Sequence, residues 1–177
     1  MTKDGPQDFP AWEEHRRTDR PHVDRTFAGV PAPVVAIAAI VDGKPTAMVA
    51  TSFSVGVSHE PPMCLFAVQA ASTTWPRLAA VPRVGVSVLG EGHADVVHRL
   101  ASRDTARRFE GVPWTRLPSG AVTLYGSPVW LECEVVQQHE AGDHRIVVLQ
   151  VHGSSVEPDH APLIHHEAVF GTFSASA

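Results

Sequence analysis

The amino-acid sequence predicts a mainly β fold, an antiparallel barrel or sandwich with a few short helices. Three observations lead to this expectation. Short apolar runs alternate as half-buried strands do, turn residues recur about every ten positions, and only two stretches have helical spacing. The strand-helix alternation of a doubly wound sheet is missing. A chain of 177 residues suits one domain with one sizeable core.

The predicted strands begin near residue 34. The branched and small apolar residues of Val34–Val41 suit a buried strand, and Asp42 and Gly43 supply turn chemistry. Thr46–Phe53 is then the return strand of a hairpin. Four further strands are expected where apolar residues run together or alternate: Met63–Val68, Val84–Val88, Val129–Val135 and Val147–Val151.

Two stretches predict short helices. Thr74–Ala80 follows serine and threonine residues that suit an N-cap, and it has a proline in its first turn. Ala94–Ala101 places Val97, Leu100 and Ala101 at helical spacing.

The N-terminal segment differs in composition from the rest of the chain. Residues 1–25 are rich in charged residues, histidine and proline, so we expect a loosely ordered arm with one helical turn around Trp12–Arg17. The folded domain is expected over residues 26–177. The N-terminus lacks the apolar core of a signal peptide, and the longest apolar run, Pro33–Val41, is too short to span a bilayer.

Several functional classes are disfavoured by composition and motifs. A net charge of −5 argues against a nucleic-acid partner, and the sequence has none of the motifs GxGxxG, GxxxxGK[ST], HExxH or GxSxG. Adjacent His165 and His166 would point to opposite faces of a strand, which argues against a shared metal. Cys64 and Cys133 each stand alone in an apolar run, as buried thiols in a reducing compartment do. We therefore expect a cytoplasmic protein without nucleic-acid, membrane or metal partners.

Three polar segments are candidates for a ligand site. They are Met48–Phe53 followed by Pro61-Pro62, then Ser72-Thr73-Thr74-Trp75-Pro76, then Gly142-Asp143-His144. Each also has a plain structural explanation as a half-buried strand, a helix cap or an ordinary turn. Together and in this order they resemble the flavin reductase family, the small partners of two-component monooxygenases.

The resemblance covers about Thr26 to Phe173 and includes further collinear segments. These are Val88-Leu89, Arg99-Leu100-Ala101, Arg108-Phe109-Glu110-Gly111-Val112-Pro113-Trp114, Pro162-Leu163 and Phe170. Ala47, Val49 and Leu100 depart from the family's usual glycine, threonine and phenylalanine. The stretch before Pro61 is one residue longer than usual, which predicts a bulge near Gly56.

The resemblance implies an FMN-binding split β-barrel, a Greek-key antiparallel barrel, with NAD(P)H:flavin oxidoreductase activity. It implies FMN as the flavin, with FAD as the alternative, and NADH or NADPH as the hydride donor. It also implies a homodimer and a flavin-dependent monooxygenase as the partner that receives reduced flavin.

The flavin carries the electron chemistry, so the expected site residues bind and orient it. Ser72 and Thr74 would meet the phosphate at a helix start, and the Thr51 and Ser52 hydroxyls would follow the ribityl chain and ring edge. The full expected set is Met48, Val49, Ala50, Thr51, Ser52, Gln69, Ser72, Thr74, Leu100, Ala101 and Phe170, where Met48, Val49 and Leu100 form an apolar bed and Phe170 covers part of the site. His144, carried over from the family's Gly-Asp-His turn, is the expected catalytic residue. It would steer the nicotinamide or stabilise charge on the reduced ring.

Two other functions fit the same residues. One is a protein that holds FMN tightly and acts directly on an organic substrate, and the other is a non-catalytic flavin-binding sensor or interaction module. The sequence is compatible with either FMN or FAD as the flavin. It is also compatible with either NADH or NADPH as the hydride donor. Candidate partners for the 2′-phosphate of NADPH are Arg103, Arg107 and Arg145.

Overall fold

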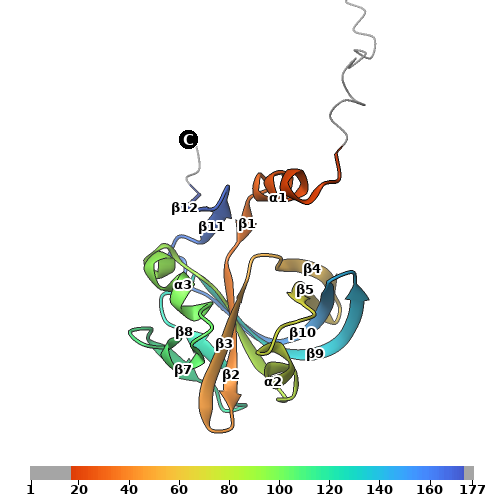
Figure 1. Ribbon diagram of the computed structural model, residues 1–177. Coiled ribbons are helices and arrows are strands. Elements are labelled where there is room, and N and C mark those ends of the chain that lie inside the picture. Colours follow the sequence, from red (N-terminus) through yellow and green to blue (C-terminus); the bar gives the residue numbers. More distant parts are fainter. Residues whose placement is uncertain (1–16, 174–177) are drawn as a thin grey trace, which may run out of the picture.

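The fold is a coiled antiparallel sheet, seen in a computed structural model that describes residues 17–173 (Figure 1). Its seven strands are ordered β3-β2-β6-β9-β10-β5-β4. Their bounds are β2 Val35–Val41, β3 Lys44–Ala50, β4 Ser54–His59, β5 Pro62–Gln69, β6 Val84–Val88, β9 Val129–Ala141 and β10 His144–Val156. The sheet curls round one core, so the predicted mainly β barrel with a few short helices is confirmed.

Two smaller sheets and five short helical segments complete the described chain. The three-stranded sheet contains β1 Ala32–Pro33, β11 Leu163–His166 and β12 Val169–Thr172, and the two-stranded sheet contains β7 Trp114–Arg116 and β8 Val122–Leu124. The helical segments are α1 Arg20–Ala28, α2 Trp75–Ala79, α3 Val97–Leu100 and the 3₁₀ turns η1 Glu91–Val96 and η2 Thr105–Arg107. None of the helices described over residues 17–173 is long and apolar enough to cross a membrane.

Strand β2 separates two clusters of buried residues, because its side chains alternate between its two faces. Val35 and Ile37 enter the barrel core with Phe66 and Trp75, whose rings meet edge to face at 5.0 Å. The opposite face of β2 packs on a second cluster beneath α3, which includes Leu100. Both cysteines are free and buried in the barrel core, as expected from their apolar surroundings.

Local turn chemistry explains the predicted hairpin and bulge. Asp42 and Gly43 both have positive φ, 52° and 74°, which is the conformation of a two-residue turn that matches strand twist. Gly56 also has positive φ, 74°, and the β4–β5 register shifts between Val55 and Ser58. The bulge expected near Gly56 is therefore present.

A glycine in β6 permits close packing of the two sheets. A Cβ added at Gly85 would lie 2.0 Å from the carbonyl oxygen of Val122, so any side chain there would displace β8. Gly85 therefore sets the distance between β6 and β8.

The six predicted strands are all present, and the predicted helix at Thr74–Ala80 corresponds to α2. The second predicted helix divides into η1 and α3. Both β9 and β10 extend over 13 residues, well beyond the alternating apolar segments that predicted them. Their outer ends are largely exposed and polar, so the apolar pattern does not reveal their full length.

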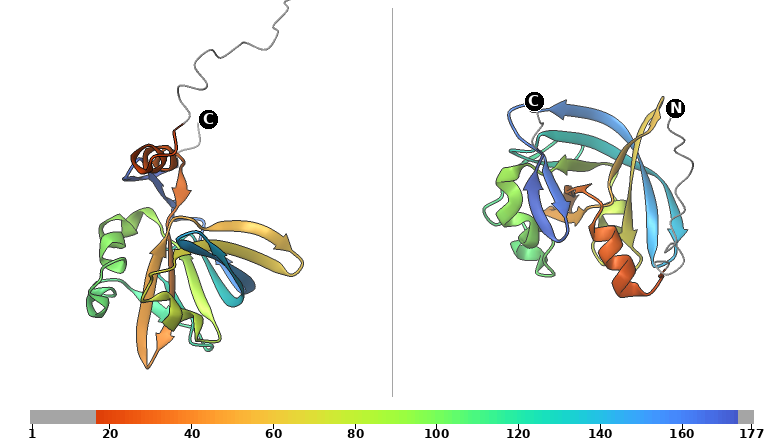
Figure 2. Two further views of the ribbon diagram at one scale, coloured as in Figure 1. Left: turned by 45° about the vertical axis from the view of Figure 1, so that its right-hand side comes forward. Right: turned by 90° about the horizontal axis from the view of Figure 1, so that it is seen from above.

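Helix α1 differs from the expected arm. The predicted boundary between residues 25 and 26 falls inside α1, while most of the helical turn expected at Trp12–Arg17 lies outside the described residues. Asp19 caps α1 by accepting from the backbone N–H of His22, and a proline occupies the first turn. The end of α1 lies beside β11–β12 at one end of the barrel (Figure 2), where Glu167 donates its N–H to the Ala28 carbonyl.

Candidate functional site

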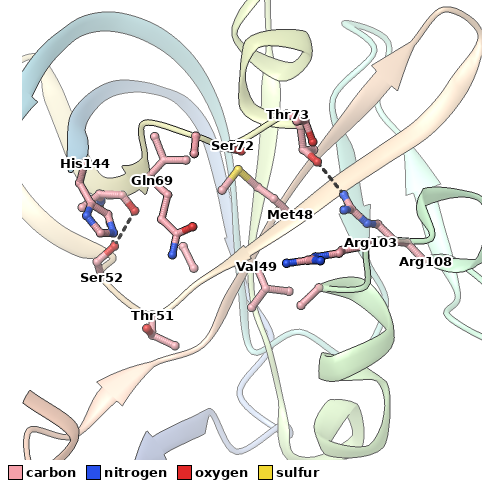
Figure 3. Close-up of a pocket in the computed structure, with 16 residues that line it drawn as sticks. Met48, Val49, Thr51, Ser52, Gln69, Ser72, Thr73, Arg103, Arg108 and His144 are labelled. Carbon is pink, nitrogen blue, oxygen red and sulfur yellow. Dashed lines mark hydrogen bonds between the residues drawn. The ribbon is translucent and has the colours of Figure 1, made fainter. Parts of the chain in front are cut away.

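A cavity of about 820 Å³ opens between β3, the end of β5, the start of α2 and the β9–β10 turn (Figure 3). It is lined by Met48, Val49, Ala50, Thr51, Ser52, Ala67, Val68, Gln69, Ala71, Ser72, Thr73, Thr74, Ala101, Arg103, Arg108 and His144. Its volume lies in the range of small-molecule and cofactor sites. We call it the main cavity.

The two ends of the main cavity differ in charge. Arg103 and Arg108 lie at one end, His144, Gln69 and Ser52 lie at the other, and Met48 and Val49 lie between (Figure 3). This arrangement suits an elongated ligand with an anionic end and a flat polar end.

Arg108 holds the cationic end together. Its side chain is 7% exposed, its Nε donates to the Ser102 carbonyl at 2.7 Å, and its Nη1 donates to the Ala47 carbonyl and to Thr74 Oγ1. Burial, and then the nearby charge of Arg77, lower the pKa of Arg108 from its ordinary value. Because Arg108 makes Thr74 Oγ1 an acceptor, the hydroxyl proton of Thr74 is free to donate to a ligand.

The start of α2 uses one of its two predicted hydroxyls as a cap. Ser72 Oγ accepts from the backbone N–H of Trp75 at 3.1 Å, whereas Thr74 makes no side-chain cap bond. Ser72 retains its own hydroxyl proton for a ligand, because it acts as an acceptor in the cap.

Ser52 joins two strands at the edge of the cavity. Its hydroxyl donates to the Ala67 carbonyl and accepts from the Ala67 N–H, both at 2.9 Å. Since this hydroxyl is already engaged, Ser52 is placed to position the segment after β3 against β5.

His144 stands at the start of β10 and is paired with its neighbour. Its Nδ1 lies 2.7 Å from Asp143 Oδ1, and its side chain is 38% exposed. The hydrogen bond from His144 lowers the pKa of Asp143. An ionised carboxylate only accepts, so Nδ1 carries the proton and Nε2 is left for a ligand.

Ten of the twelve predicted site residues line the main cavity. Leu100 does not, because α3 turns it into the core beneath β2, where it is fully buried. Phe170 does not line it either. Its ring lies between the His98 and His165 rings, at 5.6 and 5.4 Å, and so joins β12 to α3.

Six lining residues were missing from the predicted set: Ala67, Val68, Ala71, Thr73, Arg103 and Arg108. The sequence suggests Arg103 only as a partner of a 2′-phosphate. Arg108 belongs to one of the segments on which the resemblance rests. Its positive charge is the feature of the sequence that could have indicated a partner for an anionic ligand.

The family model described as "Flavin reductase like domain" matches residues 27–174. The chain belongs to the flavin reductase-like family. A flavin reductase of Pseudomonas putida is 32% identical over 146 residues, covering 82% of this chain and 85% of that protein. An actinorhodin polyketide dimerase of Streptomyces coelicolor is 34% identical over 152 residues, covering 85% of both proteins.

Other members of the flavin reductase-like family extend this similarity. HsaB of Rhodococcus jostii, the reductase subunit of a flavin-dependent monooxygenase, is 33% identical and covers 77% of this chain and 69% of that protein. The solved NADH:FAD oxidoreductase SgcE6 of Streptomyces globisporus, in complex with NAD and FAD fragments, superposes with a TM-score of 0.82 and 29% identity. That superposition covers 90% of this chain and 95% of SgcE6.

Proposed function

We propose that this chain is an NAD(P)H:flavin oxidoreductase that reduces FMN or FAD in the main cavity and supplies the reduced flavin to a separate monooxygenase. Family membership and relatives that are flavin reductases or monooxygenase reductase subunits support this function. The observation that carries it is the arrangement of one cavity, with cations and free hydroxyl protons at one end and a histidine at the other.

The residues present fit a flavin mononucleotide unit. Thr74, Ser72, Arg103 and Arg108 would hold the phosphate, because hydroxyl donors and arginine match its charge and its acceptor oxygens. Met48 and Val49 would contact the apolar part of the ring. The flavin supplies hydride acceptance when it is bound, and the protein supplies position and electrostatics.

His144 is the proposed catalytic residue. With its Nδ1 proton held by Asp143, His144 leaves Nε2 for a ligand at the end of the main cavity that it lines, where a nicotinamide would meet the flavin. This geometry supports orientation of the nicotinamide or stabilisation of developing charge by His144.

The proposal includes a homodimer in the cytoplasm. Strand β4 is an edge of the seven-stranded sheet, and its Val55 and Val57 are 66% and 45% exposed. Exposed apolar edge strands favour pairing with another chain. Light scattering after size exclusion should give twice the chain mass, and Val55→Lys should shift the protein toward the monomer.

The deciding experiment is NADH and NADPH oxidation by the purified chain, with and without added FMN or FAD. Turnover that rises with free flavin supports the reductase function and fixes both specificities. Flavin binding without turnover on either nucleotide would contradict it.

A second candidate function has support from one relative. The similarity to the actinorhodin polyketide dimerase favours a member of this fold that acts directly on an organic substrate. Retention of flavin through purification, with no increase in turnover on adding flavin, would favour that candidate.

A further inference from the structure

Arg108 is a buried cation without a counter-ion among the residues that the structure describes. Over residues 17–173, no aspartate or glutamate forms an ion pair with it, and its partners are two backbone carbonyls and one hydroxyl. A buried charge without a partner is unfavourable, so such a group in a site indicates an anionic ligand. Its Nη2 forms no hydrogen bond with the described residues and retains two protons for a ligand.

A second cavity, of about 340 Å³, also borders Arg108. It is lined by Lys44, Pro45, Thr46, Ala47, Arg77, Thr105, Ala106, Arg108 and Phe109. We call it the hairpin cavity, because four of these residues come from the start of β3. Three of its lining residues are cationic and none is acidic. Asp42 pairs with Arg77 at 3.3 Å but does not line the cavity.

The hairpin cavity also has an apolar wall. Pro45, Ala106 and Phe109 contribute apolar surface, and the Phe109 ring is fixed edge to face against Trp114 at 5.8 Å. Thr46 and Thr105 add hydroxyls. Cations and hydroxyls beside an aromatic ring match a phosphate joined to a nucleobase.

Arg108 connects the two cavities. Its guanidinium contacts Thr74, which lines the main cavity, and Ala47, which lines the hairpin cavity. A dinucleotide whose first phosphate lies at Thr74 therefore has its second phosphate beside the same cation. In FAD the adenylate is joined directly to the flavin phosphate.

We propose that the hairpin cavity binds the adenylate half of FAD, so that the enzyme reduces FAD in preference to FMN. This rests on the proposed function, which places the flavin phosphate at Thr74 and Arg108. Lys44 and Arg77 are the residues that determine the preference, since both are cations that line only the hairpin cavity.

The test measures NADH oxidation by the full chain with FAD and with FMN, in the wild type and in the variants Lys44→Gln and Arg77→Gln. The wild type should have the lower KM for FAD. Each substitution should raise the KM for FAD about tenfold, the loss expected for a charge-assisted hydrogen bond, and change the KM for FMN less than about twofold. AMP should compete with FAD and not with FMN.

Two matched control variants test whether the change in KM is specific to cations that line the hairpin cavity. Asp42→Asn breaks the ion pair of Arg77 but keeps its charge, so the KM for FAD should not rise. Arg116→Gln removes an exposed arginine of β7 that lines neither cavity, and should change neither KM. Thermal midpoints within a few degrees of the wild type would establish that the variants are folded.

Equal changes in the KM values for FAD and FMN, or no change in either, would overturn the adenylate site. A rise in the KM for NADPH alone, with FMN as acceptor, would assign the cavity to the 2′-phosphate of NADPH and overturn it too. Titration of flavin fluorescence gives the same FAD-to-FMN comparison without turnover. A chain that prefers FAD in binding but does not oxidise NADH or NADPH would contradict the proposed function and retain the adenylate site.

Discussion

His93 in η1 and Arg108 after η2 are two polar residues that are buried to a similar extent. They differ in whether the protein supplies partners for all their hydrogen bonds and for their charge. His93 is 6% exposed and Arg108 is 7% exposed. His93 Nδ1 accepts from the Gly90 N–H at 3.0 Å, and its Nε2 lies 2.9 Å from the Tyr125 carbonyl, so a neutral ring is fully paired. Arg108 keeps its charge and has no carboxylate partner among the described residues. We infer that His93 serves the fold and Arg108 serves a ligand.

The largest effect is expected from Arg108→Met. It removes the cation from the phosphate end of the main cavity. The kcat/KM for FMN should therefore fall about 10- to 100-fold, the loss expected when one charge-assisted hydrogen bond is removed. Steady-state assays with FMN and riboflavin measure this loss. Riboflavin has no phosphate, so its KM should change little. An equal loss with riboflavin would mean that Arg108 acts only on the fold.

Replacing His93 tests the other half of the comparison. His93→Leu leaves the Gly90 N–H and the Tyr125 carbonyl without partners, so the free energy of unfolding should fall by about 2 kcal/mol or more. Urea denaturation measures this change. The kcat/KM of the remaining folded enzyme should equal that of the wild type, and a specific loss of activity would contradict a purely structural role.

His144→Ala tests the opposite end of the main cavity. NAD(P)H-dependent turnover should fall at least about tenfold, as expected when one donor to developing charge is removed. Flavin fluorescence titration should give a nearly unchanged Kd. His139→Ala is the control, because His139 is an exposed histidine on the same hairpin. Turnover at the wild-type level in His144→Ala would remove this residue from the mechanism.

The smallest effect concerns pH. Burial lowers the pKa of His93, so the unfolded chain binds a proton near its ordinary value of about 6.5 that the folded chain does not bind. The free energy of unfolding should therefore decrease as the pH falls from about 7 through that value. Urea midpoints at about pH 7.5 and about pH 5.5 measure this decrease, which should be smaller in His93→Leu. Equal decreases would show that His93 does not contribute.

Local signals in the sequence were sufficient for the strands. The strand at Val84–Val88 and the Asp42-Gly43 turn depend only on neighbouring residues, and both are present, although β6 is buried on both faces and not half-buried as its alternation predicted. Asp19 and the proline of α1 are a similar local signal, but the prediction rested on the charged composition of residues 1–25 and did not include this helix. The outer ends of β9 and β10 lack an apolar pattern, because they are largely exposed in the described part of the chain.

The candidate site depended on more distant contacts. Met48 to Ser52, Ser72 and Thr74 were predicted because their order along the chain is visible in the sequence, and they line the main cavity. Leu100 lies in the cluster beneath β2 and not in the cavity lining, because helical spacing does not say which of two surfaces a helix covers. Arg108 was missed because its burial depends on Ala47, 61 residues away.

The bonds of Arg108 also have a consequence for folding. One guanidinium joins residues 47, 74 and 102, so the phosphate end of the cavity does not exist until three distant segments have met. Such contacts form late when they require closure of long loops. Flavin should then bind only the complete barrel and raise its thermal midpoint as flavin concentration increases. Recovery of flavin binding after dilution from urea would report the last step of assembly.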